Sequence, residues 1–142
     1  MTYDDKVNEA IRLASNGNTD AWNYLWTVAQ ALRVIDDLVD EPEKVGVEQK
    51  YKLANLLLVD LPSNAFFDQH KPSLLAMHLT AVNAWIDSND WMEKGKTRKT
   101  YALVIRDQIT ELVMLVAYLT GGNQHMRNVS LKIRELFLKE EF

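Results

Sequence analysis

The sequence predicts an all-α fold, a single-domain bundle of about six helices over residues 1–142. Apolar residues recur at helical spacing along most of the chain, and no segment shows the alternation typical of a strand. Only five Gly and three Pro occur, and they fall between the periodic segments, as in helical proteins. A chain of 142 residues that is 47% hydrophobic can bury one core but is too short for two ordinary domains.

The first two helices are bounded by capping residues and a chain breaker. Thr2 or Asp4 is suited to cap a first helix that ends at about residue 16. Asn18 or Thr19 is suited to cap a long second helix that runs to about residue 40, and Pro42 closes it because proline cannot continue a helix. The sequence therefore predicts two helices separated by a tight turn.

The middle of the chain contains three more helical segments. A third helix is expected over about residues 47–60, ending before the next proline. Residues 63–70 are predicted to form a short helical turn that places Phe66 and Phe67 in the core. A fourth helix is expected over about residues 72–93, because proline suits a first helical position.

Two helices complete the predicted bundle. The fifth, over about residues 97–120, is apolar almost all round, which predicts a central position. It is expected to stop at Gly121 and Gly122. A final amphipathic helix is expected over about residues 123–139.

The apolar stripes predict which side chains form the core. The second helix presents one stripe with Asp36 on its edge, and the fourth presents a broad apolar face. The stripe residues are Ala21, Leu25, Val28, Leu32, Ile35 and Val39 on the second helix, and Leu74, His78, Ala81, Val82, Trp85 and Ile86 on the fourth. Val28, Leu32, Trp85, Ile109 and Leu112 lie at the centres of such stripes and are expected to be nearly fully buried.

The most conspicuous polar segment is Asp-Asp-Leu-Val-Asp-Glu at residues 36–41. At 100° per residue, Asp36 and Asp40 share one side of a helix, whereas Asp37 points away. Ionised carboxylates beside a core are costly unless they are paired or bind a metal ion, and acids at a helix C-terminus oppose the macrodipole. The segment therefore indicates a metal or polar site, with a solvated helix end as the alternative.

Two further helices carry polar pairs at one-turn spacing, Asn89 with Glu93 and Asp107 with Glu111. Oxygen ligands without cysteine favour a hard cation, so magnesium or manganese is expected rather than zinc. The predicted metal ligands are Asp36, Asp37, Asp40, Glu93, Asp107 and Glu111. The alternative is that Arg33 and Arg106 form structural ion pairs with these acids.

A basic run occupies residues 94–99, at the predicted start of the fifth helix, where anions bind well. It is either a solvated loop or a basic lid over the acids, and the lid would create a site for a diphosphate. The predicted anion-binding residues are Arg33, Lys96, Arg98 and Lys99.

Three resemblances bear on these motifs. Residues 32–41, LRVIDDLVDE, resemble the first aspartate-rich motif of squalene and phytoene synthases, which implies that Asp36, Asp37 and Asp40 bind magnesium and a substrate diphosphate. The helical layout also resembles small all-α nucleoside triphosphate pyrophosphatases. Finally, the DDLVD segment, residues 64–67 with His70, and residues 105–107 resemble small phage-encoded helical proteins, which implies a viral or prophage origin.

The composition excludes several classes of protein. The absence of cysteine excludes disulfides and thiolate metal sites and is typical of a reducing cytosol. A net charge of −4 argues against broad nucleic-acid binding. No apolar run is long enough for a membrane span and the first residues do not resemble a signal peptide, so we expect a cytoplasmic protein, in the host cytoplasm if viral.

Two functions follow from these observations. The first is a helical binding or assembly protein of phage type, with a protein partner or a homo-oligomer as its working state and the acids held in ion pairs. The second is a magnesium-dependent enzyme acting on a diphosphate-containing substrate, like an isoprenoid synthase or a nucleoside triphosphate pyrophosphatase. Convergence of the acid pairs in one pocket favours the enzyme, and pairing of the acids with arginines favours the binding protein.

Overall fold

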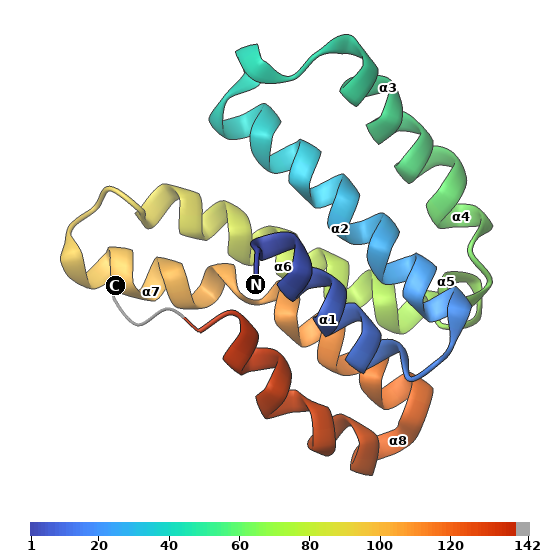
Figure 1. The fold of residues 1–142 in the computed structure, drawn as a ribbon. Helices are drawn as coiled ribbons and strands as arrows, with labels where there is room; N and C mark the ends of the chain where they lie inside the picture. Colours follow the sequence, from blue (N-terminus) through green and yellow to red (C-terminus); the bar gives the residue numbers. More distant parts are fainter. Residues whose placement is uncertain (139–142) are drawn as a thin grey trace. The chain divides into compact units, whose positions relative to one another are not determined.

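The computed structural model describes residues 1–138 and confirms the all-α class, with no β-strand in this range (Figure 1). The described chain divides into two compact units. Residues 1–16 and 71–138 form one, the terminal unit, and residues 17–70 form the other, the inserted unit. Each has its own core, and the single domain expected from chain length stays a prediction.

The inserted unit is a helical hairpin closed by a short helix (Figure 1). The long α2 is antiparallel to a second arm that begins with α3 and continues into a π-helical turn. Asn18 caps α2, as predicted, because its side chain accepts a hydrogen bond from the Ala21 N–H. The elements are α2 (Thr19–Asp40), η1 (Pro42–Lys44), α3 (Val47–Asn55), η2 (Leu56–Asp60), α4 (Leu61–Ser63) and α5 (Ala65–Gln69).

An aromatic cluster forms the core of the inserted unit. Tyr24 is fully buried, and its ring centroid lies 5.8 Å from that of Phe66 and 6.0 Å from that of Phe67. Asn64 fixes the short helix that supplies both phenylalanines: its Oδ1 accepts from the Phe67 N–H at 2.8 Å and its Nδ2 donates to the Asp20 carbonyl at 2.9 Å. The predicted helical turn with its two core aromatics is confirmed.

The buried face of α2 differs from the predicted stripe. Val28 and Leu32 are only half-buried and Val39 is exposed, so these expectations are wrong. Tyr24 packs against Phe66 and Phe67, and this contact sets which face of α2 is buried. The small residues Ala21 and Ala31 are buried on the same helix. The buried residues of α2 are Ala21, Tyr24, Leu25, Thr27, Ala31 and Val34.

The sequence predicted that the third helix ends before Pro62, but the second arm of the inserted unit continues past this residue. Helical backbone continues through the π turn η2 into α4, which contains Pro62 at an early position. Pro62 has no N–H to donate to the carbonyl of Leu58, and the wider turn lies directly before it, with the Leu61 N–H bonded to the Leu56 carbonyl. The π turn thus accommodates the proline without ending the helical path.

The terminal unit consists of α1 (Tyr3–Ser15), α6 (Lys71–Trp91), α7 (Lys96–Arg106) and α8 (Ile109–Leu136). Consecutive helices α6 and α7 form an antiparallel hairpin, and α1 packs along α8 (Figure 1). Thr2 caps α1 in a capping box with Asp5, and these hydrogen bonds lower the pKa of the Asp5 carboxyl. No helix of the described residues is long and apolar enough to cross a membrane.

The predicted fifth helix is divided in two. A turn at Asp107 and Gln108 separates α7 from α8, so Asp107 and Glu111 do not belong to one continuous helix. Farther on, the helical path is interrupted at Gly122, whose φ of 80° favours glycine. The predicted break at the two glycines is therefore confirmed, while Lys139, the predicted end of the last helix, lies outside the described residues.

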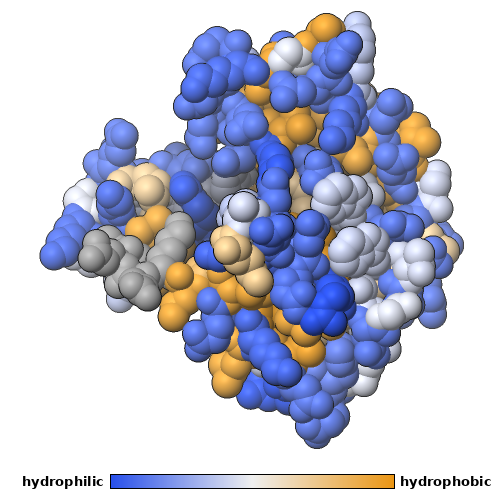
Figure 2. All heavy atoms as spheres, viewed as in Figure 1, coloured by the Kyte–Doolittle hydropathy of each residue, from blue (hydrophilic) through white to orange (hydrophobic). Residues whose placement is uncertain are grey.

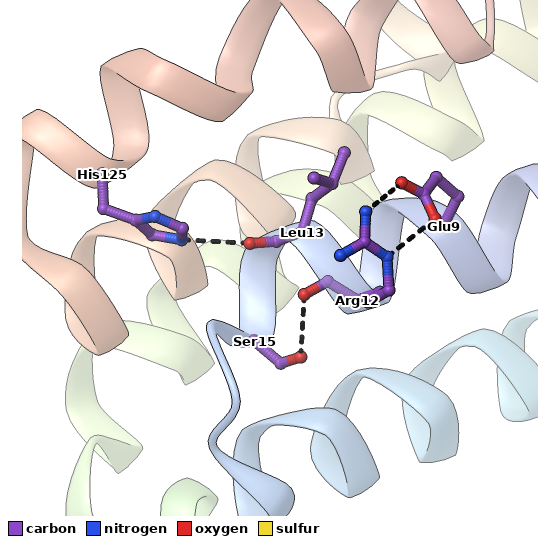
Figure 3. Close-up of polar contacts among 5 residues, drawn as sticks. All are labelled: Glu9, Arg12, Leu13, Ser15 and His125. Atoms are coloured by element: carbon purple, nitrogen blue, oxygen red, sulfur yellow. Dashed lines mark hydrogen bonds and ion pairs between the residues drawn. The ribbon is translucent and has the colours of Figure 1, made fainter.

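Polar side chains join α1 to α8. The His125 Nε2 lies 3.0 Å from the carbonyl oxygen of Leu13 (Figure 3). Figure 3 also shows the ion pair of Glu9 with Arg12 within α1. The Thr120 hydroxyl donates to the Ala14 carbonyl at 2.8 Å. These bonds satisfy carbonyls of the last turn of α1, which have no partner within that helix.

The core of the terminal unit is centred on Leu112, which is fully buried as predicted. Trp85 and Ile109 are only half-buried, against expectation, because α6 and α8 turn other residues toward this core. The other completely buried side chains of the unit include Ala14, Leu74, Ser88, Val116 and Ile133.

Candidate functional site

The aspartates near the end of α2 lie in solvent. Asp36, Asp37 and Asp40 are all exposed, which corrects the expectation that Asp36 lies against the core. The reason is the rotated face of α2, which buries Ala31 and Val34 and turns the following aspartates outward. Hydrated carboxylates avoid the cost of burial, so the physical argument that demanded a metal ion here no longer applies.

The other predicted acids occupy separate places in the terminal unit. Glu93 is exposed in the turn after α6, and Asp107 is exposed at the C-cap of α7. Glu111 accepts a hydrogen bond from Arg134 Nη2 at 2.8 Å, an ion pair between the two ends of α8. Glu111 is thus paired with an arginine, although with neither of the two that the sequence suggested.

Arg106 joins α7 to α6 through neutral groups. Its Nε donates to the Ser88 hydroxyl at 3.1 Å and its Nη2 to the Asn89 side-chain oxygen at 2.8 Å. Ser88 is fully buried and in turn donates to the Trp85 carbonyl at 2.7 Å. Asn89, which the sequence grouped with Glu93 as a metal ligand pair, therefore has a structural role in the hairpin.

Residues 1–138 contain no group of three or more His, Asp or Glu side chains that could hold a metal ion. The predicted anion-binding residues Arg33, Lys96, Arg98 and Lys99 are exposed, and Arg98 bonds within its own segment to the Lys94 carbonyl at 3.5 Å. The magnesium and diphosphate site at these residues stays a prediction.

A hollow of about 560 Å³ lies between α2 and the second arm of the inserted unit. Trp26 and Tyr51 are its most prominent apolar residues, and Lys52 at its side donates to the Gln30 side chain at 3.3 Å. Figure 2 shows hydrophobic side chains among hydrophilic ones over α3. Among residues 1–138, no buried polar side-chain atom lacks a hydrogen-bond partner.

The most unusual surface is on α6. Residues 72–86 include no Asp, Glu, Lys or Arg, and the helix is apolar on two sides. One side faces the core through Leu74 and Ala81, with His78 half-buried between them. Burial lowers the pKa of His78, which favours the neutral imidazole and leaves this stretch without charge.

The second side of α6 is exposed and forms a continuous apolar row, here called the α6 face. Its residues recur at intervals of four, three and four positions, the spacing of a helix-packing seam. The face consists of Leu75, Leu79, Val82 and Ile86, which are 47%, 73%, 46% and 48% exposed. The sequence assigned Val82 and Ile86 to the core, and both assignments are wrong.

The polar side chain of Thr80 on α6 is satisfied within its own helix. The Thr80 hydroxyl, on a third side of α6, lies 3.3 Å from the Ala76 carbonyl and 3.2 Å from that of Met77, and it donates within its own helix. An apolar helix face is ordinarily packed against another element. The face therefore has the composition of a contact surface.

Searches with this chain find no matching family model, no matching curated protein and no matching solved structure.

Proposed function

We propose that this chain is a helical binding or assembly protein that associates with another protein through the α6 face. The observation on which this rests is the row of Leu75, Leu79, Val82 and Ile86, exposed on a helix that has no charged side chain over residues 72–86. Exposed apolar rows of this kind mark interaction sites in soluble proteins. The resemblance to phage-encoded helical proteins implies a viral or prophage origin and no reaction, which is compatible with such a role.

The magnesium-dependent enzyme is the less supported alternative. Its ligands are acids in different parts of the chain, all exposed except the half-buried Glu111, which is bonded to Arg134. Carboxylates that are already hydrated or paired gain less from a cation than carboxylates that repel each other in a buried site. A binding function needs none of these acids.

Calorimetric titration with magnesium and manganese distinguishes the two functions. For a binding protein we expect no saturable heat and no rise in melting temperature with either cation, because no carboxylate cluster is relieved by the ion. Neither Asp36→Asn nor the matched control Asp87→Asn, another exposed aspartate, should then change the response to either cation. A saturable metal response that Asp36→Asn abolishes and Asp87→Asn leaves intact would overturn the proposal in favour of the enzyme.

A further inference from the structure

We propose that the partner of the α6 face is a second copy of the same chain, packed with its α6 antiparallel to the first. This inference rests on the proposed binding function and specifies its partner. Three properties of α6 favour this partner: the distribution of its charges, the spacing of its exposed row and the direction of its helix dipole.

The charges of α6 lie only at its two ends, and they have opposite signs. Lys71 begins the helix, Asp87 and Asp90 lie in its last turns, and residues 72–86 between them are uncharged. In an antiparallel pair, Lys71 of each copy lies at the end where the other copy has its two aspartates. In a parallel pair, like charges would lie together at each end.

The apolar row is also complementary to itself in the antiparallel direction. Its spacing of four, three and four positions is the same when read from either end. A twofold axis between Leu79 and Val82 therefore places Leu79 of one copy opposite Val82 of the other, and Leu75 opposite Ile86. Such a contact uses the same patch on both copies and closes after two, and the opposed dipoles of the helices favour it.

The size of the face indicates how strong this association is. Four aliphatic side chains on each copy bury less than the roughly 800 Å² per partner of a standard interface. The net charge of −4 on each copy adds weak repulsion. The dimer is therefore expected to form reversibly and to depend on protein concentration.

Sedimentation equilibrium over a wide range of protein concentration tests the inference. Wild type should approach twice the monomer mass as its concentration rises. Leu79→Glu should weaken association about a hundredfold or more, because it places two carboxylates in the apolar contact. Leu58→Glu is the matched control: Leu58 is 77% exposed on the inserted unit, so the same change in charge there should leave the dimer intact. Circular dichroism verifies that both variants are folded.

The orientation has its own measurement, because the chain contains no cysteine and accepts a single spin label at Ser73→Cys, an exposed and uncharged position near the start of α6. At 1.5 Å per residue, the antiparallel pair separates the two labels by about 23 Å, whereas a parallel pair brings them to about 10 Å. A short distance would overturn the antiparallel arrangement.

A wild type that stays monomeric at every concentration, or a Leu79→Glu variant that dimerises like wild type, would overturn the second copy as partner. Neither result bears on the binding function itself. That function fails separately, through a saturable metal response that Asp36→Asn abolishes.

Discussion

Replacing Tyr24 by alanine is expected to lower the free energy of unfolding by about 3 to 5 kcal/mol, since a large buried aromatic side chain is lost. Tyr24 is fully buried against Phe66 and Phe67, and these three rings fill the core of the inserted unit. Burial also raises the pKa of its hydroxyl, which keeps the side chain neutral. Urea denaturation followed by circular dichroism measures the change.

Tyr51→Ala is the matched control, because Tyr51 is an exposed tyrosine of the same unit. It should change the free energy of unfolding by about 0.5 kcal/mol or less. Equal losses for the two variants would show that the aromatic cluster is not the core of the inserted unit.

In the terminal unit, Leu112→Ala is expected to cost about 2 to 5 kcal/mol of unfolding free energy. Leu112 is completely buried near the start of α8, and shortening it removes apolar contacts and leaves a cavity. The same denaturation experiment measures the loss.

Leu131→Ala serves as the control for this variant, since Leu131 is an exposed leucine of the same helix. The two substitutions are chemically identical and have the same effect on helix propensity. A cost for Leu112→Ala no larger than that for Leu131→Ala would contradict its place in the core.

Local signals in the sequence predicted much of the fold. The caps at Thr2 and Asn18, the two core phenylalanines and the break at Gly122 are all found in the structure. Each of these features depends on a few neighbouring residues, because a cap or a glycine at positive φ acts within one turn of backbone.

Helix faces were harder to predict because they depend on partners far along the chain. On α6 both sides are apolar, so helical periodicity cannot decide whether Leu74 or Leu75 faces the core. On α2, burial of Tyr24 against a helix more than forty residues away rotates the whole face and moves Asp36 into solvent. The predicted acid site required Asp36 to lie beside the core, and in the structure Asp36 is exposed.

Polar partners were missed for a related reason. Arg106 was expected to neutralise an acid, but the hairpin of α6 and α7 places Ser88 and Asn89 within its reach. The sequence offered only the chemical type of each residue.

Cysteine alkylation measures whether α6 presents an open apolar face. Leu79→Cys gives a single thiol on that face, with Leu58→Cys as an exposed reference and Leu112→Cys as a buried one. At low protein concentration, where a second copy is dissociated, Leu79→Cys should react about as fast as Leu58→Cys and about a hundredfold faster than Leu112→Cys. A rate for Leu79→Cys as slow as that for Leu112→Cys would show that the α6 face is covered in the monomer.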